Sequence, residues 1–267
     1  MRFGLGKKPD SLPNFKSGDL DIVDWFPWPL CVGIVTELPL SVDRSHNQFD
    51  LVAPLYPALE QCVFGSHLNK ARRAFFDAVV HADRVLLVGE GNGRFLTTLA
   101  ACKNKGCINI VEKSAVMIRL AKERTRKLGG VGCDLNFIKT DFLEYSPADK
   151  FDCVVTHFLL DLFNPPAQRT LIKRIEELTA PSGTWINVDF LPARTVRGGI
   201  LMRLQYAFFR MASRIQARRC FDESTAAAAA GWAVAETISY LGGLVVAKRY
   251  QRAPVPAAGH DKPNRTW

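Results

Sequence analysis

The chain is predicted to be an α/β protein with a doubly wound, mostly parallel sheet of seven strands, an antiparallel hairpin at the C-terminal end and helices on both faces. Two observations predict this fold. From Arg84 to Phe190, short apolar strands alternate with amphipathic helices, which requires right-handed crossovers and therefore parallel strands. The last two apolar segments, 232–240 and 244–250, are separated only by Leu241-Gly242-Gly243, a turn short enough for an antiparallel hairpin.

Each element is expected from its local pattern. Apolar runs bounded by turn residues predict parallel strands at 84–88, 107–111, 136–139, 151–156 and 184–190. Helical spacing of apolar residues predicts helices at 68–80, 94–102, 114–128 and 165–178, and a short Ala-rich helix that ends at Gly231. In the fourth of these helices, Asn164 is expected as the N-cap, with Pro165 at the first helical position.

Four regions differ in composition. Residues 1–46 are rich in Pro, Gly, Asp and Lys and are expected to form an irregular N-terminal extension. Residues 47–252 carry the α/β pattern and are expected to be one domain. Within it, 194–230 is expected to be a mainly helical insertion. Residues 253–267, rich in Pro, Ala and Asn, are expected to be a loose tail.

Composition narrows the function classes. The formal net charge of +9 points to anionic partners without choosing among nucleic acid, an acidic membrane surface and a charged small molecule. No stretch reaches the roughly 20 uninterrupted apolar residues of a membrane span. The seven cysteines are scattered, and no second Cys/His pair accompanies Cys102 and Cys107. We therefore expect free thiols, no metal and a cytoplasmic protein.

The strongest motif is a glycine-rich turn that follows the first strand. Gly89, Gly91 and Gly93 stand at alternate positions after the apolar run 85–88, so the backbone can turn sharply and approach a ligand closely. The helix that starts at Arg94 directs its amino end to the same place, which favours a carboxylate group. Any nucleotide-binding sheet could carry such a turn, so the motif alone does not identify the ligand.

Acidic residues follow the next two strands. Glu112 ends the second strand, where a carboxylate can bind both hydroxyls of a ribose. Asp141 and Phe142 follow the third strand and offer an acceptor for an amino group and a ring to lie beside adenine. Open α/β sheets bind ligands at the carboxyl ends of their strands. The alternative is that Glu112 and Asp141 only cap the helices that follow.

The run Glu112-Lys113-Ser114-Ala115-Val116-Met117, with Ala121, resembles the acidic-x-Ser-x-x-Met…Ala pattern of class I S-adenosylmethionine-dependent methyltransferases. The resemblance covers roughly 51–251 and implies S-adenosylmethionine as cofactor. By it, Gly89, Gly91 and Gly93 would line the methionine part and Glu112 the ribose, while Asp141 and Phe142 would line the adenine. Met117 would join this cofactor-binding set.

One position departs from the family pattern. Many relatives have an acidic residue two places before the first glycine, where this chain has Leu87. Glu90 and Arg94 are therefore expected to supply polar contacts to the amino-acid end of the cofactor. NAD is the competing ligand, but the lack of a sixth parallel strand and the Asp141-Phe142 pair argue against it.

The end of the fourth strand holds the candidate catalytic residues. In the family this strand end faces the methyl group, so His157 is the first candidate for a general base or for a group that orients the nucleophile. Asp161, four residues later, would lie on the same side of a helical turn and orient the imidazole. In the alternative interpretation, His157 bonds to backbone or cofactor and Asp161 caps a helix.

The segment after the fifth strand is amphipathic and basic. Between Pro192 and Cys220 there are seven arginines and no acid. One interpretation is a lid over the substrate, with Tyr206, Phe209 and Arg210 as substrate-binding residues and 194–219 resting on an anionic membrane surface. The other is a helix packed on the sheet with solvated arginines. The sequence around Leu55-Tyr56-Pro57 and Tyr206-Ala207-Phe208-Phe209 distantly resembles methyltransferases of quinone rings.

The function expected from the sequence is methyl transfer from S-adenosylmethionine to a small, apolar or aromatic acceptor in a cytoplasmic protein, in part peripheral to the membrane. Two alternatives stay open. One is a methyltransferase of RNA or protein, which the net charge favours, although no RNA-binding module is recognisable and nucleic acid is the less favoured partner. The other is a binding or adaptor protein that keeps the fold without catalysis. The oligomeric state and the acceptor atom are left open.

Overall fold

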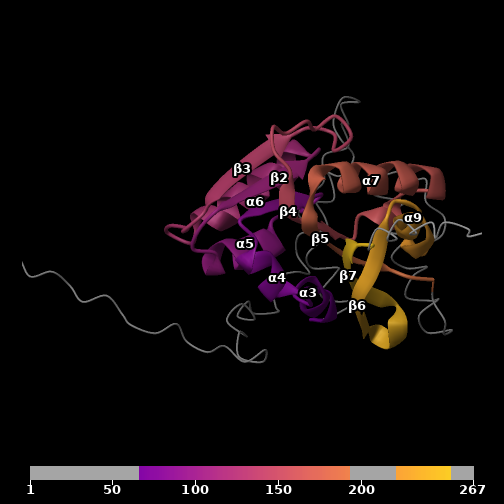
Figure 1. The fold of residues 1–267 in the computed structure, drawn as a ribbon. Helices are drawn as coiled ribbons and strands as arrows, with labels where there is room; N and C mark the ends of the chain where they lie inside the picture. Colours follow the sequence, from indigo (N-terminus) through magenta and orange to yellow (C-terminus); the bar gives the residue numbers. More distant parts are fainter. Residues whose placement is uncertain (1–65, 193–220, 254–267) are drawn as a thin grey trace, which may run out of the picture. The chain divides into compact units, whose positions relative to one another are not determined.

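The computed structural model describes residues 66–192 and 221–253, and every structural statement below concerns these two ranges. They form one seven-stranded sheet with the strand order β3-β2-β1-β4-β5-β7-β6 (Figure 1). The strands are β1 Arg84–Val88, β2 Cys107–Glu112, β3 Asp134–Lys139, β4 Phe151–His157, β5 Thr179–Phe190, β6 Trp232–Tyr240 and β7 Val245–Arg252. β1 to β5 run parallel, whereas β7 is antiparallel to both β5 and β6. The predicted fold class is confirmed.

Helices cover both faces of the sheet. On one face lie α3 His67–Arg72, α4 Phe76–His81, α5 Arg94–Cys102 and α6 Ala115–Arg126. On the other lie α7 Pro165–Leu178 and α9 Ser224–Ala229, and two 3-10 turns, η2 Leu160–Leu162 and η3 Leu241–Gly243, follow β4 and β6. Among the described helices, none is long and apolar enough to cross a membrane.

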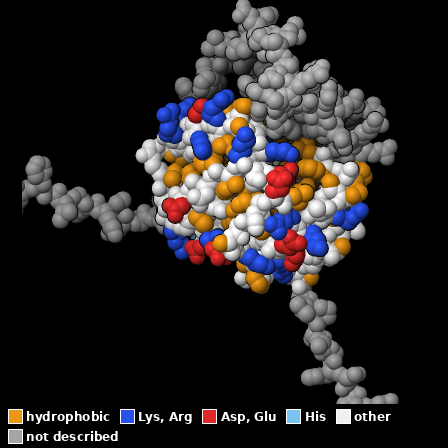
Figure 2. All heavy atoms as spheres, turned by 90° about the horizontal axis from the view of Figure 1, so that it is seen from above, with side chains coloured by type: hydrophobic (Ala, Val, Ile, Leu, Met, Phe, Trp, Pro, Cys, Tyr) orange, Lys and Arg blue, Asp and Glu red, His pale blue; other side chains and the backbone are white. Residues whose placement is uncertain are grey.

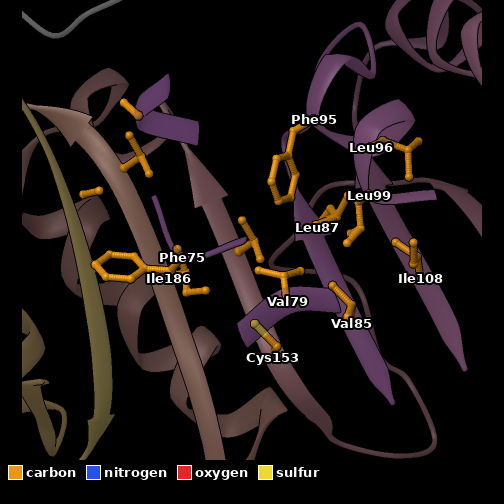
Figure 3. Close-up of a cluster of buried hydrophobic side chains, with 14 of the residues drawn as sticks. Phe75, Val79, Val85, Leu87, Phe95, Leu96, Leu99, Ile108, Cys153 and Ile186 are labelled. Atoms are coloured by element: carbon orange, nitrogen blue, oxygen red, sulfur yellow. The ribbon is translucent and has the colours of Figure 1, made fainter. Parts of the chain in front are cut away.

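The core of the first face holds α4 and α5 against β1 and its neighbours (Figure 3). Phe75, Val79 and Leu99 pack there against the sheet. The second core packs the apolar stripe of α7 against Trp185 and Tyr250, whose rings stack at 4.4 Å between centroids. Burial on both faces explains why the central strands are continuous apolar runs rather than alternating ones.

Two helix starts follow the expected capping chemistry. The Asn164 side chain accepts a 3.0 Å hydrogen bond from the Ala167 N–H at the start of α7, with Pro165 as the first helical residue. The Ser114 hydroxyl accepts a 3.2 Å bond from the Met117 N–H at the start of α6. Both starts satisfy a backbone donor that has no partner inside the helix.

Two elements differ most from the sequence-based expectation, and the other strand and helix ends differ by at most two residues. The single helix expected over 68–80 is two short helices, because at Arg73–Phe75 the bonds tighten to i→i+3 and Phe75 leaves the helical conformation (φ −123°, ψ 38°). β5 begins at Thr179, not at Thr184. Thr179 pairs with Phe151, and the residues before Thr184 bulge out before pairing resumes at Cys153.

β6 is an outer strand of the sheet and carries a register shift between Val234 and Glu236. The side chains of Val234 and Ile238 are exposed. β7, later in the chain than β6, lies between β5 and β6. The hairpin is therefore joined to the sheet through its second strand.

The strand order reverses at the centre of the sheet, between β1 and β4. β1 pairs with β2 on one side and with β4 on the other, so Val88 has Val111 and Thr156 as its Cα neighbours. From β1 the chain continues to β2 on one side, and after β3 it returns to β4 on the other side of β1. Open α/β sheets bind ligands at such a reversal, at the carboxyl ends of the strands. The residues after β1, β2, β3 and β4 therefore lie around one place.

Candidate functional site

The glycine-rich turn after β1 has the backbone shape that only glycine adopts readily. Gly89, Gly91 and Gly93 have φ values of 66°, 66° and 79°, in the left-handed region. A Cβ on Gly93 would lie 2.7 Å from the Cα of Ala121, so this glycine lets α5 pack against α6. A Cβ on Gly91 would meet no atom within 4 Å. The turn thus leaves room for a ligand to approach the Gly91 backbone.

Glu112 ties the end of β2 to this turn. Its carboxylate accepts a 3.1 Å bond from the Gly91 N–H and a 2.9 Å bond from the Ser114 N–H. Glu112 thereby fixes the glycine turn against the loop that follows β2 and holds its carboxylate beside the Gly91 backbone.

Asp141 and Phe142 lie at the end of β3, one strand further out. Asp141 accepts the Leu143 N–H at 3.0 Å and pairs with Lys113 at 3.0 Å. These contacts keep the pKa of Asp141 below its usual value, although burial opposes them. Phe142 is buried in the core beneath this turn. The pair therefore offers a charged acceptor beside an apolar ring.

Glu90 sits inside the turn and faces the start of α5. Its carboxylate accepts a 2.9 Å bond from the Leu96 N–H. Burial raises the pKa of Glu90 to about 7, against the opposing effects of that bond and of the nearby Arg72 charge. Arg94, half-buried, is the first residue of α5. Glu90 therefore occupies the helix start that was expected to receive the cofactor carboxylate.

Leu87 is explained by the core beneath the turn. Its side chain is 1% exposed and packs among Val85, Val79 and Leu99 (Figure 3). An ionised carboxylate at this position would lose its hydration without a partner. This is a physical reason for the departure from the family pattern.

His157 ends β4 directly beside the glycine turn. Its side chain is 7% exposed and packs edge-on against Phe95, with 4.6 Å between ring centroids. Neither ring nitrogen has a hydrogen-bond partner in the part of the chain that the structure describes. Burial, and then the Arg72 charge, lower the pKa of His157 well below its usual value. The imidazole is therefore neutral and has an open lone pair.

The expected contact between His157 and Asp161 is not formed. Asp161 lies in the η2 turn, and its carboxyl interacts with that of Asp189 at the end of β5 instead. Helical i,i+4 geometry was assumed, whereas the chain after His157 turns through the left-handed Phe158, so the spacing no longer places the two side chains together. Asp161 Oδ1 is buried without a described partner.

Three residues that matter at this site were missed from the sequence. Phe158 has φ +53° and packs on Phe190 at 5.1 Å; no local pattern signals such a conformation. Arg72, from α3, lies over the Phe158 ring at 4.8 Å, and only the fold brings it there. Asp189 could have been noticed, because it is an acid inside the apolar run Trp185–Phe190.

The remaining sequence-predicted residues lie outside the described ranges. These are the proposed substrate-binding residues Tyr206, Phe209 and Arg210, and most of the 194–230 insertion. The extension 1–46 and nearly all of the tail 253–267 are likewise outside them. Met117, by contrast, is described in the first turn of α6 beside the Glu112 loop.

Comparison with known proteins agrees with this geometry. The profile of the family described as "Methyltransferase domain" matches residues 85–183. A carboxy-S-adenosyl-L-methionine synthase of Nautilia profundicola is 28% identical over 104 residues, which are 39% of this chain and 43% of that protein. The match thus spans less than half of the relative's length.

Solved structures share the fold at low identity. A methyltransferase of Haloferax volcanii, solved in complex with the Trm112 activator, is 19% identical with a TM-score of 0.59, over 80% of this chain and all of that one. Magnesium protoporphyrin IX methyltransferase of Synechocystis, solved with bound SAH, is 16% identical with a TM-score of 0.56, over 76% and 97%. Residues 85–183 are therefore similar to the methyltransferase domain family, and the described part of the chain shares its fold with these solved methyltransferases.

Proposed function

We propose that the protein transfers the methyl group of S-adenosylmethionine to a small acceptor with an apolar or aromatic body. One observation carries the proposal. The glycine turn, Glu112 and Asp141-Phe142 lie at the ends of β1, β2 and β3, and His157, buried and unpartnered among the described residues, ends β4 beside them. Cofactor-binding groups and a neutral proton acceptor thus converge on the switch point of the sheet.

The residues have a limited chemical task. When bound, the cofactor supplies a methyl group on a sulfonium with a good leaving group. The protein therefore has to hold the acceptor in line and exclude water. The partly exposed Phe158, next to His157, rests on the buried ring of Phe190, which favours an apolar or aromatic acceptor. His157, neutral because its pKa is lowered, can accept a hydrogen bond or a proton from it.

Calorimetric titration with S-adenosylmethionine, S-adenosylhomocysteine and NAD tests the cofactor assignment. We expect micromolar binding of the first two and none of NAD. In Glu112→Ala, loss of the charged acceptor should weaken binding by about 10- to 100-fold. Glu123→Ala, an exposed acid on the outer side of α6, is the matched control and should bind like the wild type. Absence of binding to folded wild-type protein would refute the proposal.

The acceptor class is tested by release of S-adenosylhomocysteine in the presence of a panel of phenols, quinols and aromatic amines, with bulk RNA as comparison. Figure 2 shows basic and acidic side chains interspersed among apolar ones on one face of the described part, without a continuous basic stripe. This face therefore offers RNA no continuous basic surface, and we choose the small acceptor as the first class to test. Turnover with RNA that falls steeply with salt would reverse that choice.

A second candidate follows from Arg72. The Nautilia relative is named for making carboxy-S-adenosyl-L-methionine, and the Arg72 guanidinium lies over Phe158, next to His157 in sequence. A carboxylate on the transferred group would be attracted to this cation. If carboxy-S-adenosyl-L-methionine binds more tightly than S-adenosylmethionine, and Arg72→Gln removes the difference while Arg72→Lys retains part of it, this candidate is favoured.

A further inference from the structure

We propose that Asp189 is a positioning residue, which forms with Asp161 a buried carboxyl pair that sets the turn 158–162 and thereby places His157 and Phe158. The pair lies beyond the cofactor-binding groups, at the ends of β5 and β4. The inference rests on the proposed function only in one respect, namely that His157 and Phe158 act on the acceptor. The pair and the turn can be tested without any substrate.

Hydrogen bonds to Asp189 hold the turn directly. One oxygen, Oδ2, accepts the N–H groups of Leu160 at 2.9 Å and of Asp161 at 3.1 Å. The other, Oδ1, accepts the N–H of Phe190 at 3.0 Å. These groups are buried, and an N–H left without an acceptor there costs about 1–3 kcal/mol. A single carboxyl therefore satisfies three backbone donors, two of them in the turn.

The turn needs this support because it contains a strained residue. Phe158 has φ +53°, a conformation that costs a non-glycine residue about 1–3 kcal/mol and persists only where the surroundings enforce it. The Phe158 N–H donates to the Val188 carbonyl at 2.7 Å, and the Gln168 amide donates to the Leu160 carbonyl at 2.8 Å. With Asp189, both ends of the turn are fixed.

A shared proton allows two acids to be buried together. Asp161 and Asp189 are each 4% exposed, and their carboxyl groups interact. Two adjacent buried carboxylates repel each other, so the pair is stable when it holds one proton. We place this proton on Asp161, facing Asp189, because Asp189 already accepts three backbone N–H bonds. Burial raises the pKa of both carboxyl groups above its usual value.

The charged surroundings support a proton held at neutral pH. Glu223, just before α9, adds a negative charge that acts on Asp189. Lys248 of β7 lies 3.3 Å from Glu223 Oε1 and is also bonded to Asp222. From β4, the neighbouring ionisable group is His157, which is neutral, and α7 contributes the uncharged Gln168. Loss of the shared proton at higher pH should therefore loosen the turn.

The experiment is amide hydrogen exchange of the full chain, expressed as protection factors for Leu160 and Asp161, from about pH 6 to about pH 9, where buried carboxyls can titrate. In the wild type we expect protection to fall as the pH rises. Asp161→Asn keeps a permanent donor toward Asp189, so protection should stay high across the range. Asp189→Ala should lower protection of both amides at every pH by about 10-fold or more.

Controls separate positioning from general destabilisation. Asp152→Asn removes a carboxylate that also accepts a backbone N–H, from Arg84 at 2.9 Å, but at the other end of β4; it should leave the turn unaffected. If Asp189→Ala does not fold, the proposal is decided by two results: the fall in protection with rising pH in the wild type, and the absence of that fall in Asp161→Asn. The proposal is overturned if folded Asp189→Ala keeps wild-type protection of the two amides. It is also overturned if Asp161→Asn loses protection at high pH as the wild type does.

Calorimetry with S-adenosylhomocysteine on the same samples keeps the two proposals distinguishable. If the wild type does not bind it but the exchange results are as expected, the proposed function fails and the carboxyl pair stands. If the wild type binds it and the exchange results are contrary, the pair fails and the function stands.

Discussion

The ends of β1 to β3 and the ends of β4 and β5 lie at the same edge of the sheet, but they hold their polar side chains differently. We call them the cofactor half and the acceptor half. In the cofactor half, Glu112 and Asp141 are half-buried and accept N–H bonds from their own loops. In the acceptor half, His157 is buried without a described hydrogen-bond partner, and two buried carboxyls face each other.

The contrast indicates two kinds of preorganisation. The cofactor half is arranged by local backbone bonds, which stabilise the fold and the binding site together. In the acceptor half, groups are kept in an arrangement that the fold alone would not favour, which is frequent where proteins hold reactive groups. Replacing His157 should therefore change stability in the opposite direction from replacing a residue of the cofactor half.

The largest expected effect is in the cofactor half, at Gly93. In Gly93→Ala the added Cβ would lie 2.7 Å from Ala121 backbone at φ +79°, so we expect a loss of about 2–5 kcal/mol in the free energy of unfolding. Gly91→Ala has φ +66° and no such neighbour and should lose only about 1–2 kcal/mol. Urea denaturation measures both, and equal losses would mean that helix contact at Gly93 is unimportant.

The second prediction also concerns the cofactor half. Glu112→Gln places an NH2 group where a carboxylate oxygen accepts the N–H of Gly91 or Ser114. Two donors then face each other, and we expect the free energy of unfolding to fall by about 1–3 kcal/mol. Chemical denaturation with and without S-adenosylhomocysteine measures stability and binding together. A variant as stable as the wild type would contradict the description of this half.

At His157, in the acceptor half, the expected change in stability has the opposite sign. His157→Phe removes two buried nitrogens without described partners, and we expect the free energy of unfolding to rise by about 1–2 kcal/mol while methyl transfer is lost. Because the folded-state pKa of His157 is lowered, its contribution to stability is lost as the pH falls below about 6.5, the usual pKa in an unfolded chain. The variant should lack that dependence. Thermal denaturation between pH 5 and 8 measures it, and a destabilised variant would break the contrast.

The smallest effect is expected at Glu90, on the boundary of the two halves. Its folded-state pKa of about 7 exceeds the unfolded value of 4.5, so its protonated form favours folding and stability is lost as the pH rises from about 4.5 to 7. Glu90→Gln should remove this loss but also weaken the bond from the Leu96 N–H, so the net gain in stability at pH 8 should be only about 1 kcal/mol. If stability depends on pH in the same way in the variant and the wild type, Glu90 is stable as a hydrogen-bonded carboxylate, like Glu112 and Asp141.

The sequence was informative where structure is local. The glycine turn, Ser114 and Asn164 could be recognised because their partners lie within a few residues along the chain. The environments of Leu87 and Asp161 could not be predicted from the local sequence. The core under β1 surrounds Leu87, and the left-handed turn at Phe158 sets the direction of Asp161. Arg72 and Asp189 reach the site only through strand order and packing. Their roles depend on contacts between distant segments, which single-sequence periodicity does not encode.

The position of β7 between β5 and β6 has a consequence for how the chain acquires its structure. The outer edge of β5 cannot be covered until β7 is available, although β6 is synthesised earlier. Until then β6 also lacks its neighbour, and the apolar row from Trp185 to Phe190 presents an open edge. Pairing between such distant segments is slow, and an uncovered edge attracts other chains. The interval before this pairing is therefore when the growing chain is most exposed to aggregation.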